Sequence, residues 1–508
     1  MVDVYVIGRG PAELAAALEF AEVGLRVRVG HASVAAAGDE AIAGFAPYDV
    51  TDADGTLRSF LDHVAAPLSP GGAALSAASP IVEPPEPVLL RGARGGWAMQ
   101  PEPSVFGIPA VPLSEASLAI LGSGAATRAF LDRVGPVLTI GKTRTLGKLV
   151  RSRIGAGALD RLVEPFVSEK FGVAAADVDV AIAAPGLNED VTTAGSLCGA
   201  ALSYSKRHVA RETRVRPAGG WSGLRDALIE RLAYFGVEFA DGAATGMRRA
   251  RLSSGPTTPG VSSADGDGDD DGWIVEEAGA EVSARAVIVN VRSRELPGFP
   301  RTEAPQREVR WIAELDVTAP DFATTREADR HAQAALEAVV APSGERWSAR
   351  WVEERNRPGS TREEVDERSE QGAPSNSSWQ LRLSGPSVGV SNVADSSDAA
   401  AAATALGAIG EPSRDARREI DALISGLLAA ARSERTPGAE LQLRLVPAPF
   451  TSISVRDRAL AHITLAREAE SSCVEVGPES HSGDLAAAVL DARAVAVQLR
   501  RRLTGIAE

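Results

Sequence analysis

The sequence is poor in cysteine, histidine and positive charge. Its 2 cysteines, Cys198 and Cys473, have no CxxC spacing, which argues against a disulfide framework and indicates a reducing compartment. Its 6 histidines are scattered and form no HxxH or HExxH pair, so we predict no metal site. The formal net charge of −15 favours no nucleic-acid partner, and we predict none.

Long apolar runs are also missing. The first run, VYVIG, meets Gly8 after a few residues and has an acidic approach, so it is typical of neither a signal peptide nor a membrane span. No later stretch reaches the roughly 20 apolar residues that a transmembrane helix needs. We therefore expect a cytoplasmic protein, with peripheral membrane contact as an alternative. Its 508 residues suggest about two or three domains.

The chain begins with the pattern of a βαβ unit. Residues 3–7 predict a buried strand, Gly8 and Gly10 a tight turn, 11–23 an Ala/Leu-rich helix and 25–29 a second strand. Near the other end, VEVGPESHSGDLAAAVLDARAVAVQL again indicates a strand, a glycine-containing turn and a helix. A mixed α/β fold follows from these patterns.

The middle of the chain changes character several times. Residues 34–106 indicate loops and short strands, 113–172 a helical insertion, and 216–240 a Gly-Gly turn followed by an amphipathic helix and a strand. The block 355–400, rich in Ser, Glu, Asp and Ala, is typical of a long surface excursion.

One acidic loop loosely resembles a calcium-binding loop. Asp265, Asp267, Asp269 and Glu276 have a similar spacing, but Asp270 stands where such a loop needs its turn glycine. A solvated loop without a metal is the alternative, and we favour it.

The resemblance to a known family becomes specific at residues 135–180. The stretch GPVLTIGKTRTLGKLVRSRIGAGALDRLVEPFVSEKFGVAAADVDV is similar to a segment of bacterial porphyrinogen oxidases, in which an R-x-R-x-G helix precedes a sequence like RLVEPF. RVRPAGGWSGLRDALIERL matches the Gly-Gly turn and amphipathic helix of that family, and IPAVPLSEASL and PAPFTSISVRDRALAHI match more loosely, in family order. The chain thus resembles the protoporphyrinogen/coproporphyrinogen oxidase family, within the amine-oxidase-like FAD superfamily.

The resemblance implies a fold and an activity. The fold is mixed α/β (α+β) with a Rossmann-like FAD-binding domain, a β-sheet substrate domain and a helical domain. The implied bounds are 1–55 with 211–300 and 440–508, then 56–110 with 301–439, then 111–210. The activity is oxidation of a porphyrinogen in haem biosynthesis, in which FAD accepts hydride equivalents and passes them to an acceptor such as oxygen.

The glycine turn departs from the pattern that a dinucleotide requires. Gly8 and Gly10 fill the positions of the tight turn and of the backbone approach to the pyrophosphate. Glu13 replaces the third glycine, where its side chain would crowd the helix or repel the pyrophosphate, and would itself complement the helix N-terminus. His31 stands where an acidic residue should hold the adenosine ribose.

Two further segments bear on the cofactor. The family's Gly-Gly-Arg/Lys turn is replaced by Gly38, Asp39 and Glu40, so acids stand where a cation is expected near the diphosphate. At the other end of the chain, Gly483 and Asp484 predict a helix N-terminus at the flavin end of the cofactor.

Basic residues suggest two other contacts. Arg151 and Arg153 are predicted to meet porphyrin propionates or anionic lipid, with a solvated helix face as the alternative. Arg26 and Arg28 near His31 suggest a 2′-phosphate, and hence NADP, or the exposed face of a strand.

These observations lead to three hypotheses about function. The first is an FAD-dependent oxidoreductase of the porphyrinogen oxidase type, acting on a small-molecule porphyrinogen. The second is a non-catalytic paralogue that has lost FAD binding and serves as a binding or regulatory protein. The third is an amine or carotenoid oxidoreductase of the same superfamily.

Overall fold

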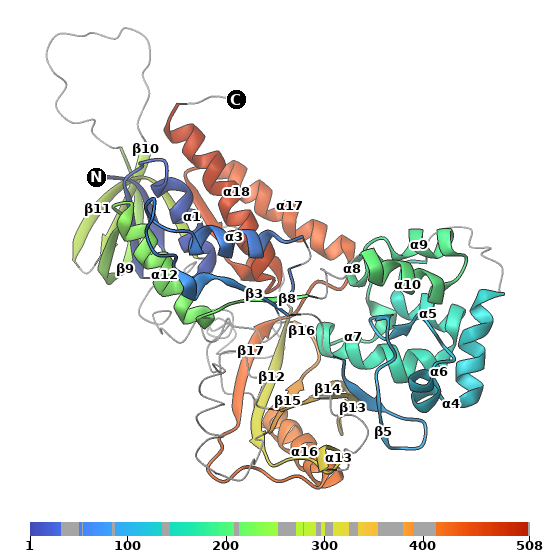
Figure 1. Cartoon of the computed structure of the whole chain (residues 1–508). Coiled ribbons are helices and arrows are strands. Elements are labelled where there is room, and N and C mark those ends of the chain that lie inside the picture. Colours follow the sequence, from blue (N-terminus) through green and yellow to red (C-terminus); the bar gives the residue numbers. More distant parts are fainter. Residues whose placement is uncertain are drawn as a thin grey trace, which may run out of the picture. The chain divides into compact units, whose positions relative to one another are not determined.

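The computed structural model describes residues 1–31, 50–52, 54–83, 87–134, 143–207, 213–251, 271–277, 279–290, 296–299, 308–324, 334–353, 379–389 and 413–505. The chain divides into two compact units, each built from separate segments (Figure 1). Unit 1 comprises residues 1–82, 215–305 and 459–508, and unit 2 comprises residues 83–214 and 306–458.

Three of the sequence predictions fall outside the described residues. These are the turn at Gly38, Asp39 and Glu40, the acidic loop before β10 (Asp271–Glu277), and most of the excursion at 355–400. They stay predictions.

Unit 1 is an α/β unit, and three of its elements (β3, β8 and α17) cross its boundaries. Unit 1 also contains β10, whose bounds are given above. The bounds are β1 (Val2–Ile7), α1 (Pro11–Ala21), β2 (Val27–His31), α3 (Thr56–Ala65), β3 (Pro80–Glu83), β8 (Arg214–Pro217), α12 (Gly220–Tyr234), β9 (Glu238–Arg251), β11 (Ala280–Asn290), α17 (Ile453–Ala469), β18 (Cys473–Val476) and α18 (Leu485–Leu503).

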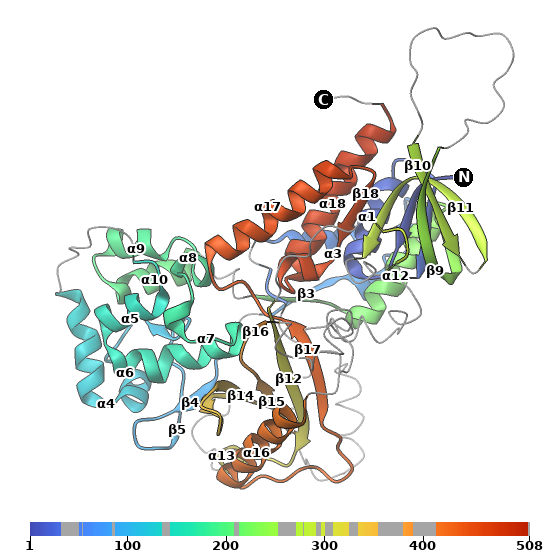
Figure 2. The same cartoon turned by 180° about the vertical axis from the view of Figure 1, so that it is seen from behind.

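The sheet of unit 1 places β1 between β2 and β11, both parallel to it. β9 and β18 extend the parallel part, and β10 joins β9 to β11 as an antiparallel ribbon, seen from behind in Figure 2. The chain leaves β1 through α1 and returns in β2 on one side, whereas β11 lies on the other. Such a reversal of strand order creates the crevice in which parallel sheets bind ligands.

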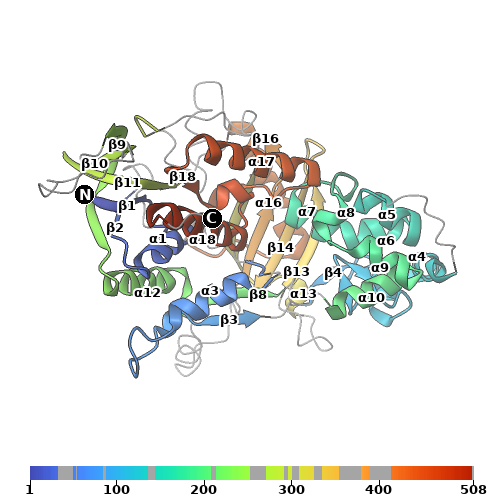
Figure 3. The same ribbon diagram turned by 90° about the horizontal axis from the view of Figure 1, so that it is seen from above.

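Both faces of β1 are buried. Val4 and Val6 pack into a core shared with α1, α12 and α18, whereas Tyr5 and Ile7 belong to a second core beneath the ribbon of β9, β10 and β11. This explains why VDVYVI is a nearly continuous apolar run rather than an alternating one. Helices α1 and α18 lie side by side against the first face (Figure 3).

Helix α3 changes one predicted boundary. Leu57, Phe60, Leu61 and Val64 recur at helical spacing and are buried in the core of β1, α1 and α12. The structure therefore keeps residues 56–82 in unit 1, whereas the sequence prediction ended that segment at residue 55. The division into three domains as a whole stays a prediction.

Unit 2 combines a helical cluster with a sheet. Its elements are β4 (Leu89–Arg91), β5 (Trp97–Met99), β6 (Ser104–Val105), β7 (Ile108–Pro109), α4 (Glu115–Phe130), α5 (Leu146–Ile154), α6 (Ala156–Ala158), α7 (Glu164–Phe171), α8 (Val180–Ala183), α9 (Leu187–Ala194), α10 (Leu197–Arg207), β12 (Glu308–Val317), α13 (Asp321–Thr324), β13 (Ala334–Val340), β14 (Arg346–Glu353), β15 (Trp379–Ser384), β16 (Val388–Gly389), α16 (Arg414–Ala431) and β17 (Gln442–Pro447).

The 8-stranded sheet of unit 2 has the order β16-β12-β15-β14-β13-β4-β5, with β17 also paired to β12. One face buries Trp351 and Trp379 against α16. The other face contributes Ala334 and Leu336 to the core of the helical cluster. The sheet of unit 2 is thus covered differently on its two sides.

Candidate functional site

The glycine turn lies at the carboxyl edge of the unit 1 sheet. Ile7 pairs in register with Gly30 and Val289, so Gly8, the end of β2 and Asn290 meet at this edge. Gly8 has a φ of 125°, a conformation that side chains disfavour, and a Cβ there would come within 3.0 Å of the Asn290 Cβ. The turn leads directly into the N-terminus of α1, where backbone amides are ready to bind an anion.

Glu13 occupies the space above this turn. Glu13 is 1% exposed, and its carboxylate lies so close to Gly10 that a Cβ on that glycine would overlap Oε2. The Asn290 side-chain amide donates a hydrogen bond to Glu13 Oε1. Glu13 therefore turns inward, as one of the two sequence-based expectations for this residue had it.

The inward carboxylate decides whether a dinucleotide fits. Glycines at this turn normally let the backbone approach a pyrophosphate that rests on the helix N-terminus. Here a buried negative group already lies against Gly10 and complements the first turn of α1, an interaction worth about 0.3–1 kcal/mol. A pyrophosphate would meet this charge at close range, so the residues at the turn do not fit FAD as they stand.

Arg9 and His31 lie beside the turn. The Arg9 Nη2 donates to the carbonyl oxygen of Ala240 at 2.6 Å, and its guanidinium lies 5.4 Å from the ring centre of Phe239. Arg9 thus reaches from the turn to β9. His31 is half-buried at the end of β2, paired in register with Ala243, the position at which the sequence predicted a ribose contact.

Arg26 and Arg28 are held by carboxylates. Arg26 donates to Asp3 through Nε and Nη2, both at 3.2 Å. Arg28 donates to Glu277 through Nε at 3.0 Å and Nη2 at 2.9 Å, and to Glu238 through Nη1 at 2.9 Å. Their charges are compensated inside unit 1, which gives the NADP alternative no support.

Tyr5 shares the Glu277 carboxylate with Arg28. Its hydroxyl donates to Glu277 Oε2 at 3.1 Å, in space left by Gly30, where a Cβ would overlap the hydroxyl. Burial, followed by the Glu277 charge, raises the pKa of Tyr5 above its ordinary value. The hydrogen bonds to Glu277 and Glu238 also raise the pKa of Arg28. This network ties β1 and β2 to β10.

The C-terminal glycine turn is built differently. Gly477 follows β18, and Ser482 and Gly483 adopt left-handed conformations with φ values of 54° and 84°. Asp484 then caps α18, because its Oδ1 accepts a hydrogen bond from the Ala487 amide at 3.0 Å. The predicted helix N-terminus therefore forms, and the Asp484 side chain binds its own helix.

Ion pairs of Asp491 hold this turn against α17 and α18. Asp491 of α18 accepts hydrogen bonds from Arg467 at 2.8 and 2.6 Å and lies 3.2 Å from His481 Nε2. Burial raises the pKa of Asp491, but the hydrogen bonds and charges of Arg467 and His481 outweigh it and hold that pKa well below its ordinary value.

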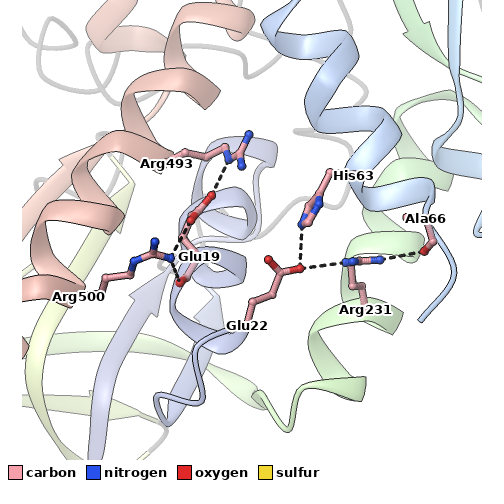
Figure 4. A network of polar contacts seen from close by, with 7 residues as sticks. All are labelled: Glu19, Glu22, His63, Ala66, Arg231, Arg493 and Arg500. Carbon is pink, nitrogen blue, oxygen red and sulfur yellow. Dashed lines mark hydrogen bonds and ion pairs between the residues drawn. The ribbon is translucent and has the colours of Figure 1, made fainter. Parts of the chain in front are cut away.

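Glu19 anchors α1 to α18 (Figure 4). Arg493 Nε donates to Glu19 Oε1 at 2.8 Å, and Arg500 Nη1 donates to Glu19 Oε2 at 3.1 Å. These contacts hold the helix that begins at the glycine turn against its neighbour.

Glu22 anchors the same helix to α3 and α12 (Figure 4). Its Oε1 lies 2.8 Å from His63 Nε2 and 3.3 Å from Arg231 Nε, and Arg231 Nη1 donates to the Ala66 carbonyl oxygen at 2.9 Å. Burial raises the pKa of Glu22, but His63 and Arg231 outweigh it and hold that pKa below its ordinary value. The position of α1 is thus fixed by charge as well as by its apolar face.

The predicted substrate arginines lie in unit 2, on α5. Arg153 is mostly buried, with Nε 2.6 Å from Asp132 Oδ1 and Nη2 donating to the Gly195 carbonyl oxygen at 3.0 Å. Arg151 is exposed. Arg153 therefore serves the packing of the helical cluster, and the role of both residues in binding substrate stays a prediction.

Asn290 was missed by the sequence reasoning. Its strand, ARAVIVN, is evident from the pattern, but only the parallel pairing of β11 with β1 brings its amide to Glu13. Long-range pairing of this kind leaves no local signal.

Two kinds of feature, a metal centre and a membrane-spanning helix, are absent from the described part of the chain. There, no group of three or more His, Cys, Asp or Glu residues is arranged to hold a metal ion. None of the helices described is long and apolar enough to cross a membrane. Cys198 and Cys473 are both buried and free, and burial raises the pKa of Cys198 to about 12.

Comparison with known proteins supports the fold. No family model matches the sequence, and no curated protein matches it. A candidate protoporphyrinogen oxidase from Exiguobacterium sp. 255-15 has a similar structure, with a TM-score of 0.61 and 13% identity over 98% of this chain and 99% of that chain. Reduced UDP-galactopyranose mutase gives a TM-score of 0.53 and 14% identity over 100% of this chain and 96% of that chain. The predicted mixed α/β fold is confirmed, and the low identities fit a divergent sequence.

Proposed function

We propose that this chain retains the fold of the FAD-dependent oxidoreductases but acts as a binding or regulatory protein without flavin. The observation that carries this proposal is the buried Glu13 carboxylate above Gly10, held by Asn290. A built-in anion at the N-terminus of α1 replaces the phosphate that such a turn otherwise binds.

The size of the effect supports the proposal. Glu13 adds a negative charge at the pyrophosphate position, and His31 removes the carboxylate that would bind a ribose. If each of these two changes costs about 1–2 kcal/mol, as loss of a charge-assisted hydrogen bond does, the affinity for FAD falls by about 30- to 1,000-fold. The resemblance to porphyrinogen oxidases suggests a porphyrin, or an active oxidase, as what the protein binds.

The second candidate is an FAD-dependent oxidoreductase that oxidises a porphyrinogen. It is favoured by the retained glycines Gly8 and Gly10, and by the helix N-terminus formed after Gly483. For this function, the Glu13 side chain would have to leave the turn before a cofactor enters. Haem biosynthesis and the predicted substrate contacts of Arg151 and Arg153 belong to this candidate.

The absorbance spectrum of the purified full-length chain separates the two candidates. The proposal predicts a colourless protein whose melting temperature does not change when FAD is added. A yellow protein with flavin absorbance, or a saturable rise in melting temperature with FAD, would establish the second candidate, and porphyrinogen oxidation would then be assayed. Addition of AMP in place of FAD controls for binding of the adenine half alone.

A further inference from the structure

Arginines cross one face of the sheet of unit 2. Glu314 pairs in register with Arg382, which pairs with Arg350 on the next strand, and Ile312 pairs with Arg444. Because opposed residues share a face and every second residue along a strand returns to it, one face carries all of these side chains and that of Arg310. We call this the arginine face, formed on the neighbouring strands β17, β12, β15 and β14 by Arg444, Arg310, Arg382 and Arg350.

Three of these arginines have carboxylate partners. Arg444 Nη2 donates to Glu314 Oε2 at 2.8 Å, and Arg382 Nε lies 3.6 Å from Glu314 Oε1. Arg350 Nη2 donates to Glu169 Oε2 at 2.9 Å. These pairs hold the outer parts of the face in place.

Arg310 is different. It is 3% exposed, and its Nη1 donates to the Lys170 carbonyl oxygen at 2.9 Å. Its Nε and Nη2 are buried and make no hydrogen bond within the described part of the chain. Buried guanidinium groups are ordinarily paired with an anion, because an unpaired buried charge is strongly unfavourable.

The two Arg310 nitrogens without a hydrogen bond to the described residues, Nε and Nη2, form one edge of the guanidinium. Nε and Nη2 lie side by side on the guanidinium plane, and elsewhere in this chain the same edge grips a carboxylate, as in Arg28 with Glu277 at 3.0 and 2.9 Å. Burial and the nearby Arg382 charge lower the pKa of Arg310 to about 9, and the Glu169 carboxylate, which accepts hydrogen bonds from Arg350, opposes this shift only in part.

We propose that Arg310 binds an oxyanion group of an organic ligand through Nε and Nη2, with Arg382 adding to the positive potential. A carboxylate and a phosphate both match this edge. The porphyrin suggested by the resemblance would bind through its carboxylates, whereas a phosphorylated ligand would bind through its phosphate. The site lies within unit 2 and does not depend on whether unit 1 binds a flavin.

Calorimetric titration of the full-length chain tests this site. The carboxylate probe is coproporphyrin and the phosphate probe is inorganic pyrophosphate. We expect saturable binding of one of them, weakened about 100-fold in Arg310→Met, as loss of a bidentate charged contact implies. Arg418→Met, at an exposed position on α16, should leave the affinity unchanged. Binding of neither probe, or equal binding by Arg310→Met, would overturn the proposal.

Stability without ligand separates a binding role from a structural one. If Arg310 is kept for a ligand, Arg310→Met should unfold at the same temperature as the unliganded wild type or a higher one, because the substitution removes a buried charge that no carboxylate of the described residues binds directly. A fall of several degrees would show that the guanidinium supports the fold and would contradict the proposal. Arg310→Lys, which keeps the charge but not the two-nitrogen edge, should fold and still lose most of the affinity.

Discussion

The two ends of helix α1 use the same residue type for different purposes. Towards its C-terminus, Glu19 and Glu22 face guanidinium groups from α18 and α12 (Figure 4). At its N-terminus, Glu13 faces the backbone of the glycine turn and the amide of Asn290. The first pair fixes where the helix lies, whereas Glu13 fills the place at which the helix would act on a ligand.

The difference shows how a binding turn can be closed without loss of the fold. The Gly8 conformation, the pairing of β1 with β2 and the anchoring of α1 are all retained. One carboxylate at the third residue of the helix supplies the negative charge that the amides favour. A fold match therefore gives no information about the cofactor, and the side chain at this one position does.

The largest expected effect concerns the C-terminal end of α1. Arg231→Met removes the buried guanidinium between Glu22 and the Ala66 carbonyl. It should lower the free energy of unfolding by about 3 kcal/mol, because the Glu22 carboxylate and the Ala66 carbonyl oxygen both lose a charged donor. Urea denaturation measures this. Arg58→Met, which breaks only an exposed pair with Asp62, should change stability by less than about 0.5 kcal/mol. Equal losses in the two variants would remove the anchoring role.

The second effect concerns the N-terminal end. Glu13→Gln keeps the shape of the side chain but removes its charge, and should lower the free energy of unfolding by about 1 kcal/mol through the weaker interaction with the helix N-terminus. Urea denaturation at neutral pH provides the measurement. If Glu13→Gln were more stable than the wild type, the Glu13 carboxylate would destabilise the fold and would not act as a built-in ligand of the helix N-terminus.

Asp484 is a second carboxylate at a helix N-terminus, and it separates the effect of charge from that of a hydrogen bond. Asp484→Ala removes the cap of α18 and should cost about 1 kcal/mol of stability, with Asp484→Asn recovering most of it because an amide oxygen also caps. Thermal unfolding of both variants gives the answer. Similar losses in both would mean that the Asp484 charge, and not its hydrogen bond, is what matters.

The smallest effect is the pH dependence of the Glu22 contacts. The pKa of Glu22 is lower in the folded chain than in the unfolded chain, so its contribution is complete above the unfolded value of about 4.3 and is lost as the pH falls through the folded value. Glu22→Gln should therefore flatten the decline of stability below about pH 4.3. An unchanged decline in this variant would assign the acid sensitivity to other carboxylates.

The sequence predicted the parts of the fold that depend on local pattern. VDVYVIGRG gave β1 and its turn, and the run after Asp484 gave α18, because strand and helix periodicities are visible within a few residues. It also singled out Glu13 as the residue that departs from a dinucleotide pattern. The orientation of Glu13 was left open, because a side chain at the third helical position can turn outward or inward.

Other features depended on contacts between distant segments. Asn290 reaches Glu13 only through the pairing of β11 with β1, and Arg153 meets Asp132 only once the helical cluster is packed. Residues 56–82 join unit 1 because the apolar face of α3 completes its core. Arg310 did not stand out in the sequence either, since only the folded chain shows that two of its buried nitrogens make no hydrogen bond to the described residues.

Whether Glu13 closes the glycine turn to a dinucleotide can be measured by titration of FAD, followed by flavin fluorescence, into the wild type and into Glu13→Gly/His31→Glu. We expect no saturable binding by the wild type below about 1 mM FAD and at least about 30-fold tighter binding by the double variant, because the built-in carboxylate is removed and the ribose acceptor is restored. Binding by the wild type near about 1 µM, or equal affinities of the two proteins, would contradict this expectation.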